Sequence, residues 1–503
     1  MKKLNKGGAS IWGRIFRALV LALPLSLYFS YFPVISLGAN GSMNFELSIP
    51  LIWLVVFDVV GGIYAFYRKV LFVKIGRKWM WLLFPVWLSL SVLWSPNMTR
   101  GVLTVGILWL IYFACYLMWR LRDEFGGDFR ERFLKWFFGA TIFVCTWCVI
   151  QCILDLVNVS RDYSLMCAGC TYKMFGFPHP NGFAIEPQFM GNLLLAPMIV
   201  VGWQIFRSWP RPAGPSPRAA GANSRAAALR NAISLKYFAI LFVLVVTLFL
   251  TFSRGAIYAA IVGLCFMSGF KIFSKKKERK NAVKQVGVVW GIVILSFVVA
   301  LNIQGVMAAV SPTNDTYVTG VTKVLNHLSL GVIDIRGEKP MESDVVVENP
   351  VENSVDKGNE AVFDGYVAES TDTRVKLSGV AMKTWARDFP TMLFGVGIGG
   401  AGQAIYDNGL SPSPKEIVQN EYPAILLETG LVGFILFVLA VLLLIKFVLK
   451  SSAKMMALSL LVAYGVSLVF FSGLPNALQI YLLPMLFTVI FYKSIDLRKK
   501  LVS

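Results

Sequence analysis

The sequence predicts an all-α polytopic membrane protein with about twelve transmembrane helices. Hydrophobic residues make up 56% of the chain and charged residues only 15%, which is more apolar surface than a soluble protein of this size can bury. The apolar residues form segments of roughly twenty residues, the length that a bilayer requires. Basic residues gather in alternate connections between these segments.

The predicted spans are apolar segments bounded by charged or turn-forming residues. They cover residues 15–37, 47–67, 79–95, 100–119, 133–157, 185–206, 234–252, 255–273, 285–308, 421–448, 453–472 and 474–493.

The positions of the basic residues predict the orientation of these spans. Every even-numbered connection is basic, whereas the odd-numbered ones are mostly short, neutral or acidic. Because cytoplasmic loops carry the excess of Lys and Arg, both termini are expected in the cytoplasm. The net charge of +20 therefore reflects membrane orientation and contact with anionic lipids rather than nucleic-acid binding.

Three regions follow from this topology. Residues 1–308 form spans one to nine, residues 309–420 form a large extracytoplasmic loop, and residues 421–503 form the last three spans and a cytoplasmic C-terminus. The loop contains fifteen acidic and nine basic residues from 309 to 419. Its Arg374–Asp388 segment has the apolar spacing of a short amphipathic helix.

Arg254 lies in a Ser-Arg-Gly turn between the seventh and eighth spans, on the predicted outer side. An ionisable residue at a membrane boundary is expensive and indicates a function. The alternative is an arginine that extends to the lipid headgroups. The remaining outer residues favour the functional interpretation.

The outer loop before the sixth span contains His179 and ends in Glu186-Pro187. Proline fits the first turn of a helix, so Glu186 is expected at a helix N-terminus, where the dipole stabilises a carboxylate. Helix capping and a catalytic role for Glu186 are equally open. A structural role is favoured for His179.

Several outer groups have the chemistry of an anion site. Arg254, Arg374, the glycine-rich segment 394–402 and the polar cluster 419–422 are all predicted on the same side. Arginine binds phosphate in a planar bidentate manner, and glycine-rich loops can turn N–H groups toward phosphate oxygens. Beside an apolar bundle, this set suggests a polyprenyl-diphosphate-linked substrate.

The order of these motifs resembles the O-antigen ligase/polymerase family of integral-membrane glycosyltransferases. The resemblance runs from about Phe175 to Val438. The motifs are Gly182–Pro187, Ser253-Arg254-Gly255, Arg374 before an amphipathic segment, Gly395 with Gly397, and the Asn420–Gly433 run.

The resemblance implies a GT-C-like, metal-independent enzyme without a cofactor, acting at the outer face of the cytoplasmic membrane. Such enzymes move a glycan from undecaprenyl diphosphate to a hydroxyl of a glycan, lipid or protein acceptor, with inversion. Arg254 and Arg374 match the two arginines expected to hold the donor diphosphate.

One residue departs from the family pattern. Gln419 occupies a position where the family often has histidine, and glutamine cannot act as a general base. The candidate bases are then Glu186, Glu421 and His179, in that order, with Gln419, Asn420, Tyr422 and Gly397 in supporting roles. The leaving diphosphate can also collect the proton.

Two other functions fit the composition. About twelve spans is also typical of a transporter or flippase of lipid-linked glycans, but a transporter is expected to show repeated halves, and no repeat is apparent. A non-catalytic membrane scaffold is the other alternative, and Gln419 favours it slightly. The sugar, the acceptor and the choice between ligase and polymerase stay open.

Overall fold

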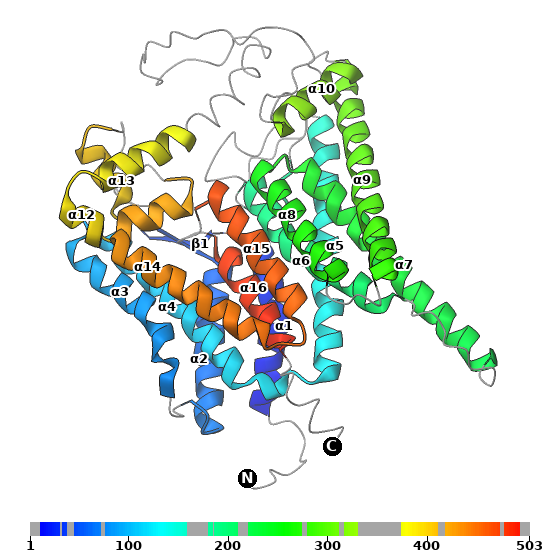
Figure 1. The fold of residues 1–503 in the computed structure, drawn as a ribbon, viewed down its shortest axis with the longest axis horizontal. Helices are drawn as coiled ribbons and strands as arrows, with labels where there is room; N and C mark the ends of the chain where they lie inside the picture. Colours follow the sequence, from blue (N-terminus) through cyan, green and yellow to red (C-terminus); the bar gives the residue numbers. More distant parts are fainter. Residues whose placement is uncertain are drawn as a thin grey trace.

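The computed structural model describes twelve stretches of the chain. It is almost entirely helical over these stretches, with one two-stranded hairpin (Figure 1). The described residues are 11–30, 33–37, 45–71, 76–157, 180–184, 186–209, 220–273, 279–310, 316–329, 374–410, 418–472 and 477–492.

Eight helices of the described chain are long and apolar enough to cross a membrane. They are α1 (Ile11–Tyr28), α2 (Ile49–Tyr67), α4 (Met98–Arg120), α5 (Gly127–Leu156), α6 (Pro187–Ser208), α8 (Arg254–Phe273), α9 (Arg279–Val310) and α14 (Glu421–Leu449). This confirms the polytopic class.

Shorter apolar helices occupy the remaining predicted spans. The first is the Trp79–Trp94 segment, which consists of the end of η1 (Gly76–Leu82), α3 (Leu83–Ser91) and η2 (Val92–Trp94). The others are the second half of α7 (Ala220–Leu250), α15 (Lys454–Phe470) and α16 (Leu478–Ile490). A further short helix, η3 (Arg122–Glu124), links α4 to α5.

The predicted first span, 15–37, is wrong in its second half. Helix α1 ends at Tyr28, and β1 (Pro33–Leu37) then pairs antiparallel with β2 (Phe45–Ser48). Pro33 removes a helical N–H donor, and the β-branched Val34 and Ile35 favour a strand. The all-α prediction therefore needs this hairpin added.

The connection over residues 207–236 is helical in its second half. Helix α7 begins at Ala220, well before the apolar segment. The sequence there is rich in alanine, including Ala226–Ala228, and alanine has the strongest helix propensity of all residues.

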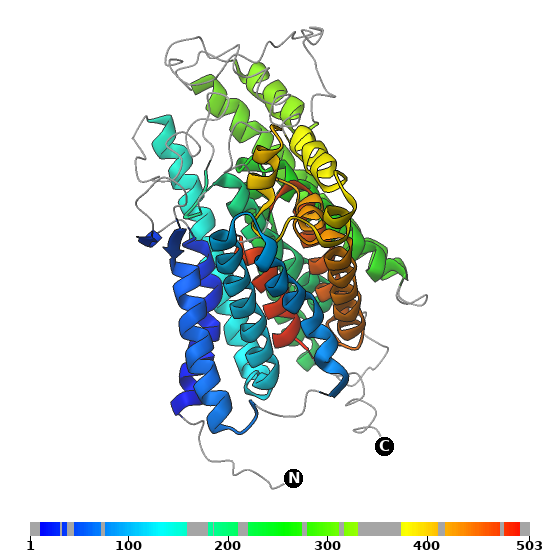
Figure 2. The same cartoon turned by 90° about the vertical axis from the view of Figure 1, so that its left-hand side faces the viewer.

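Elements of the large loop lie at one end of the bundle. They are α10 (Tyr317–Leu328), a helix over residues 374–385, α12 (Phe389–Phe394) and α13 (Ala401–Asp407). Figures 1 and 2 show α10, α13 and the 374–385 helix at the end opposite the first turn of α1. The amphipathic helix expected in Arg374–Asp388 is thus present.

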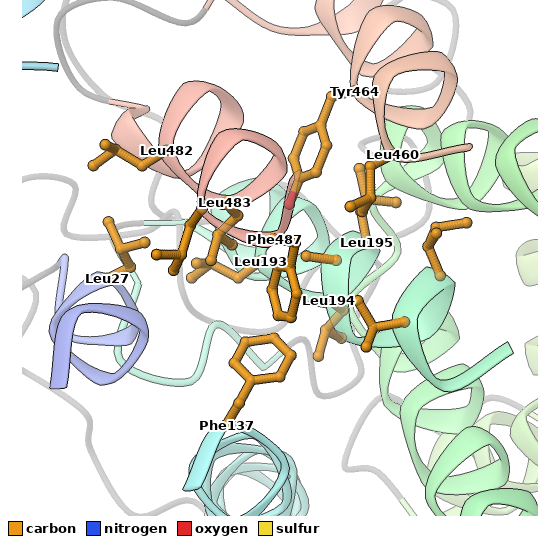
Figure 3. Close-up of a cluster of buried hydrophobic side chains, with 14 of the residues drawn as sticks. Leu27, Phe137, Leu193, Leu194, Leu195, Leu460, Tyr464, Leu482, Leu483 and Phe487 are labelled. Carbon is orange, nitrogen blue, oxygen red and sulfur yellow. The ribbon is translucent and has the colours of Figure 1, made fainter. Parts of the chain in front are cut away.

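Helix α6 forms the centre of the bundle. Every residue of its apolar window is buried, and it packs against α7, α8 and α15. In Figure 3, Leu193, Leu194 and Leu195 of α6 lie among side chains from α1, α5, α15 and α16. This helix therefore has no face left for lipid.

Helix α14 is broken near its first third. Gly430 has φ 66° and ψ −176°, which are not helical values. The break frees the carbonyls of residues 427–429, and other elements then donate to them. Val396 N–H bonds to the Leu427 carbonyl and Gly397 N–H bonds to the Glu428 carbonyl, each at 2.9 Å. The Trp87 indole N–H bonds to the Thr429 carbonyl at 3.0 Å. The glycine-rich loop and α3 thus satisfy the broken helix.

The same crossing brings two backbones into close contact. A Cβ added at Gly430 would lie 2.2 Å from the Leu393 carbonyl oxygen, and one added at Gly395 would lie 2.5 Å from the Glu428 carbonyl oxygen. Both glycines have positive φ. Neither position accommodates a side chain without moving backbone.

We expect Gly430→Ala to lower the free energy of unfolding by about 3 kcal/mol, because it adds left-handed strain to a backbone clash. Thermal unfolding of the purified protein in detergent measures this. Gly106→Ala in α4 is the matched control, since no atom lies within 4 Å of a Cβ there. Equal unfolding temperatures for the two variants would contradict the predicted clash.

Candidate active site

Arg254 is the first residue of α8 and follows a tight turn from α7. Phe252 in this turn has φ 51°, a left-handed conformation that costs a non-glycine residue about 1–2 kcal/mol. The turn also touches α6, because a Cβ on Gly191 would lie 2.8 Å from the Ser253 Cβ. Arg254 is only 6% exposed, so it lies inside the helix bundle.

Helix α10 supports this turn from the large loop. The His327 Nε2–H donates to the Phe252 carbonyl at 3.0 Å, and the two rings pack edge to face. The Tyr258 hydroxyl donates to the Leu328 carbonyl. Lys323, one helical turn before His327, is 5% exposed. The face of α10 that contacts the turn therefore carries a buried cation.

Arg374 joins the loop to the bundle through two glutamines. Its Nε donates to Gln419 Oε1 at 2.7 Å, and its Nη2 donates to Gln188 Oε1 at 3.2 Å. Gln188 Nε2 in turn donates to the Phe470 carbonyl at 2.8 Å. The guanidinium is thus connected to the N-terminus of α6 and the C-terminus of α15.

Phe470 also contacts the beginning of α8. A Cβ on Gly255 would lie 2.5 Å from the Phe470 Cβ. The centroids of the Tyr258 and Phe470 rings are 5.9 Å apart. Arg254 precedes Gly255, and Arg374 reaches Phe470 through Gln188. Phe470 is thus a common neighbour of Gly255, the residue after Arg254, and of Gln188, which bonds to Arg374.

Glu186 occupies the N-cap position of α6, and Pro187 is the first residue of the helix. Its side chain makes no capping hydrogen bond, so the position expected for a cap is confirmed but the capping bond is absent. Burial raises the pKa of Glu186, and the nearby positive charge of Arg374 opposes this rise. The carboxyl therefore lies within electrostatic range of that guanidinium.

Glu421 is buried at the first turn of α14, with 6% of its surface exposed. Its two carboxylate oxygens accept hydrogen bonds from the Tyr481 hydroxyl at 2.7 Å and the Ser472 hydroxyl at 3.0 Å. Ser472 lies two residues after Phe470. Glu421 is thus held close to the C-terminal end of α15.

Two neighbours of Glu421 have structural contacts. The Asn420 side chain caps α14 by accepting from the Tyr422 N–H at 3.2 Å. The Tyr422 hydroxyl donates to the Gly465 carbonyl of α15 at 2.7 Å. Both residues fix the entry into α14 and hence the position of Glu421.

The glycine-rich loop does not present its N–H groups in the way expected of a phosphate-binding loop. Gly397 N–H bonds to the Glu428 carbonyl, Ile398 N–H to the Ser91 hydroxyl at 3.3 Å, and Ala401 N–H to Glu428 Oε1 at 3.3 Å. These donors are used within the protein. Gly397 therefore has a packing role: its N–H bonds to α14, and a Cβ there would lie 2.6 Å from the Ser95 Cα.

A cavity lies between α3, α4, the glycine-rich loop, α14 and α16, and we call it the α4–α14 cavity. Its polar lining consists of Arg100, Thr104, Glu421, Glu428, Thr429, Ser472 and Tyr481. Glu421 thus lines this cavity and bonds to Ser472, two residues after Phe470.

Sequence reasoning missed several residues of this region. Gln188 directly follows Glu186-Pro187, and Arg100 follows the Ser95–Asn97 turn at the start of α4, so each had a weak positional signal. Ser472 and Tyr481 had none. His179, the third candidate base, lies outside the described residues.

The comparison with family models gave one match. Residues 239–438 match the family described as O-antigen ligase. The matched segment is similar to this family. It covers about two fifths of the chain and contains Arg254, Arg374 and Glu421, whereas Glu186, α15 and α16 lie outside it. The comparisons with curated proteins and with solved structures found no match.

The family match and the apolar helices agree on the broad class. They indicate a multi-pass membrane protein that acts as a glycosyltransferase of ligase or polymerase type in polysaccharide assembly. The resemblance inferred from the motifs is confirmed over residues 239–438.

We expect Gln188→Leu to loosen the 374–385 helix, because the variant loses the hydrogen bond from Arg374 and the bond to the Phe470 carbonyl. Losing a hydrogen bond to a charged group should raise amide exchange at the start of that helix about tenfold. Hydrogen–deuterium exchange mass spectrometry measures this. Gln403→Leu on α13 is the control, since Gln403 bonds only locally to Asp407 in the described structure. Unchanged exchange in Gln188→Leu would refute the bridge.

Proposed function

We propose that this protein transfers a glycan from undecaprenyl diphosphate to an acceptor hydroxyl at the outer face of the cytoplasmic membrane. The observation that carries the proposal is the contact of Phe470 with both Gly255, the residue after Arg254, and Gln188, which bonds to Arg374. Both arginines lie within the O-antigen ligase segment. A pair of arginines suits the two phosphates of such a donor.

In the proposed reaction the acceptor oxygen attacks the anomeric carbon of the donor sugar. The bond from that carbon to the diphosphate oxygen breaks, and undecaprenyl diphosphate leaves with both electrons. Direct displacement inverts the anomeric configuration. Arg254 and Arg374 stabilise the charge that develops on the leaving diphosphate, which is an electrostatic form of catalysis.

The acceptor proton goes to a carboxylate in this proposal, and geometry favours Glu421 over Glu186. Glu421 lines the α4–α14 cavity and is held by Tyr481 and Ser472. Glu186 lies beside Arg374, where it tunes a donor-binding group. This order reverses the one that the sequence alone suggested.

The orientation is supported by the basic even-numbered connections together with the grouping of loop elements at one end of the bundle (Figures 1 and 2). In this topology the apolar helices make twelve spans, both termini are cytoplasmic, and the donor diphosphate binds at the outer end. Glycan transfer by the purified protein from a lipid-linked donor separates this function from transport and from a scaffold role.

We expect Arg254→Lys and Arg374→Lys each to reduce glycan transfer at least about 100-fold, because lysine keeps the charge but not the bidentate geometry. The assay uses purified protein and a lipid-linked donor, with expression and membrane insertion checked. Arg387→Lys is the matched control, since Arg387 pairs with exposed Asp388 and with Asn408. Normal transfer by either site variant would refute the diphosphate clamp.

We expect the apparent KM for the donor to fall as the pH decreases through the pKa of Glu186, which burial places above its usual 4.5. Protonation removes a negative charge beside Arg374, so the guanidinium is freer to bind diphosphate. Glu186→Gln should have a low KM that no longer changes with pH, with little change in kcat. The opposite result is a Glu186→Gln variant whose kcat falls and whose plot of kcat against pH loses its acidic limb. That result would make Glu186 the base.

A further inference from the structure

The α4–α14 cavity has both polar and apolar lining residues. The polar ones include Glu421, Glu428 and Arg100, and the apolar ones include Leu108, Ile425 and Phe437. Sugar-binding sites need hydrogen-bonding side chains for hydroxyl groups together with apolar or aromatic surface for the C–H face of the ring. The cavity provides both kinds of surface.

The charges around this cavity select against anions. Two carboxylates, Glu421 and Glu428, face a single guanidinium, that of Arg100. Arg100 also interacts electrostatically with Glu428, which reduces its attraction for a ligand anion. A carboxylate or phosphate on the ligand would meet net negative charge, whereas a neutral polyol can donate hydroxyl hydrogens to both glutamates.

The two carboxylates of the cavity lining are held in place by hydrogen bonds. Glu421 is bonded by Tyr481 and Ser472, and Glu428 Oε1 accepts from the Ala401 N–H at 3.3 Å. The kink at Gly430 and the glycine-rich loop fix the backbone behind Glu428. Such support is what a specific subsite requires.

The cavity reaches the end of α15, where Phe470 contacts Gly255 and Gln188. Ser472, which lines the cavity and bonds to Glu421, lies two residues after Phe470, the residue that links Gly255 and Gln188. A group bound in the cavity is therefore next to the region assigned to the donor diphosphate, as an attacking acceptor must be.

We infer that the α4–α14 cavity is the acceptor subsite and that it takes an uncharged sugar ring, whose hydroxyl group is presented to Glu421. This inference rests on the proposed glycan transfer and extends it, because it excludes acceptors whose reacting unit is a uronic acid or a phosphorylated sugar. Glu428 and Arg100 position the sugar, and Glu421 accepts the proton of the reacting hydroxyl.

The test is direct binding, measured without a donor. Full-length protein in nanodiscs is incubated with methyl glycosides of glucose, galactose and mannose, or with the matching methyl uronides, at millimolar concentrations. Hydrogen–deuterium exchange is then followed in residues 98–104, 398–402 and 421–429. We expect at least one neutral glycoside to protect these segments and its uronide to protect them far less.

Two variants refine the test. Glu428→Gln should weaken binding of the neutral glycoside about tenfold, the size expected for losing a charge-assisted hydrogen bond, and should reduce the discrimination against the uronide. Asp407→Asn is the control, because it makes the same change of charge at an exposed residue that does not line the cavity. It should bind like the unmodified protein.

The outcomes separate this inference from the proposed function. Transfer from a lipid-linked donor without protection by any neutral glycoside, or with equal protection by the uronides, overturns the subsite and leaves the function standing. Protection of the cavity in a protein that performs no transfer upholds the sugar site and overturns its role as an acceptor subsite.

Discussion

The break in α14 at Gly430 is the constraint on which the site depends. A helix interrupted within the bilayer must have its freed carbonyls satisfied by protein. The N–H groups of Val396 and Gly397 and the indole of Trp87 do this here. The glycine-rich loop must therefore enter the bundle and lie against α14, which explains why glycines with positive φ occur where the two backbones cross.

This crossing gives the two halves of the site different kinds of support. Glu428 and the α4–α14 cavity are held by backbone contacts that tolerate almost no displacement. Arg374 is held by side-chain hydrogen bonds to two glutamines, which are easier to rearrange. The proposed acceptor subsite is therefore rigid, whereas Arg374, proposed to bind the donor diphosphate, is held by contacts that can rearrange.

Sequence reasoning succeeded where the membrane itself imposes a pattern. Hydropathy located the apolar helices because span length is fixed by the bilayer, and the positions of Arg254 and Arg374 followed from short motifs. It failed for Gln188, whose contact with Phe470 joins residues 282 positions apart. It also failed for the glycine-rich loop, because glycine spacing indicates backbone freedom but not what the N–H groups will meet. The hairpin at Pro33–Leu37 was missed because its apolar residues continue the hydropathy of α1.

The complete burial of α6 has a consequence for how the chain is made. Helices α15 and α16 cover part of α6, yet they are synthesised only after the large loop has passed across the membrane in the proposed topology. Until then α6 exposes to lipid a surface that the finished protein hides, including Asn192, which later pairs with Ser467 of α15. Phe470 and Ser472 arrive at the same late stage. The arginines and Glu421 thus acquire their common neighbours only when the last helices insert, so an unfinished chain lacks an assembled site.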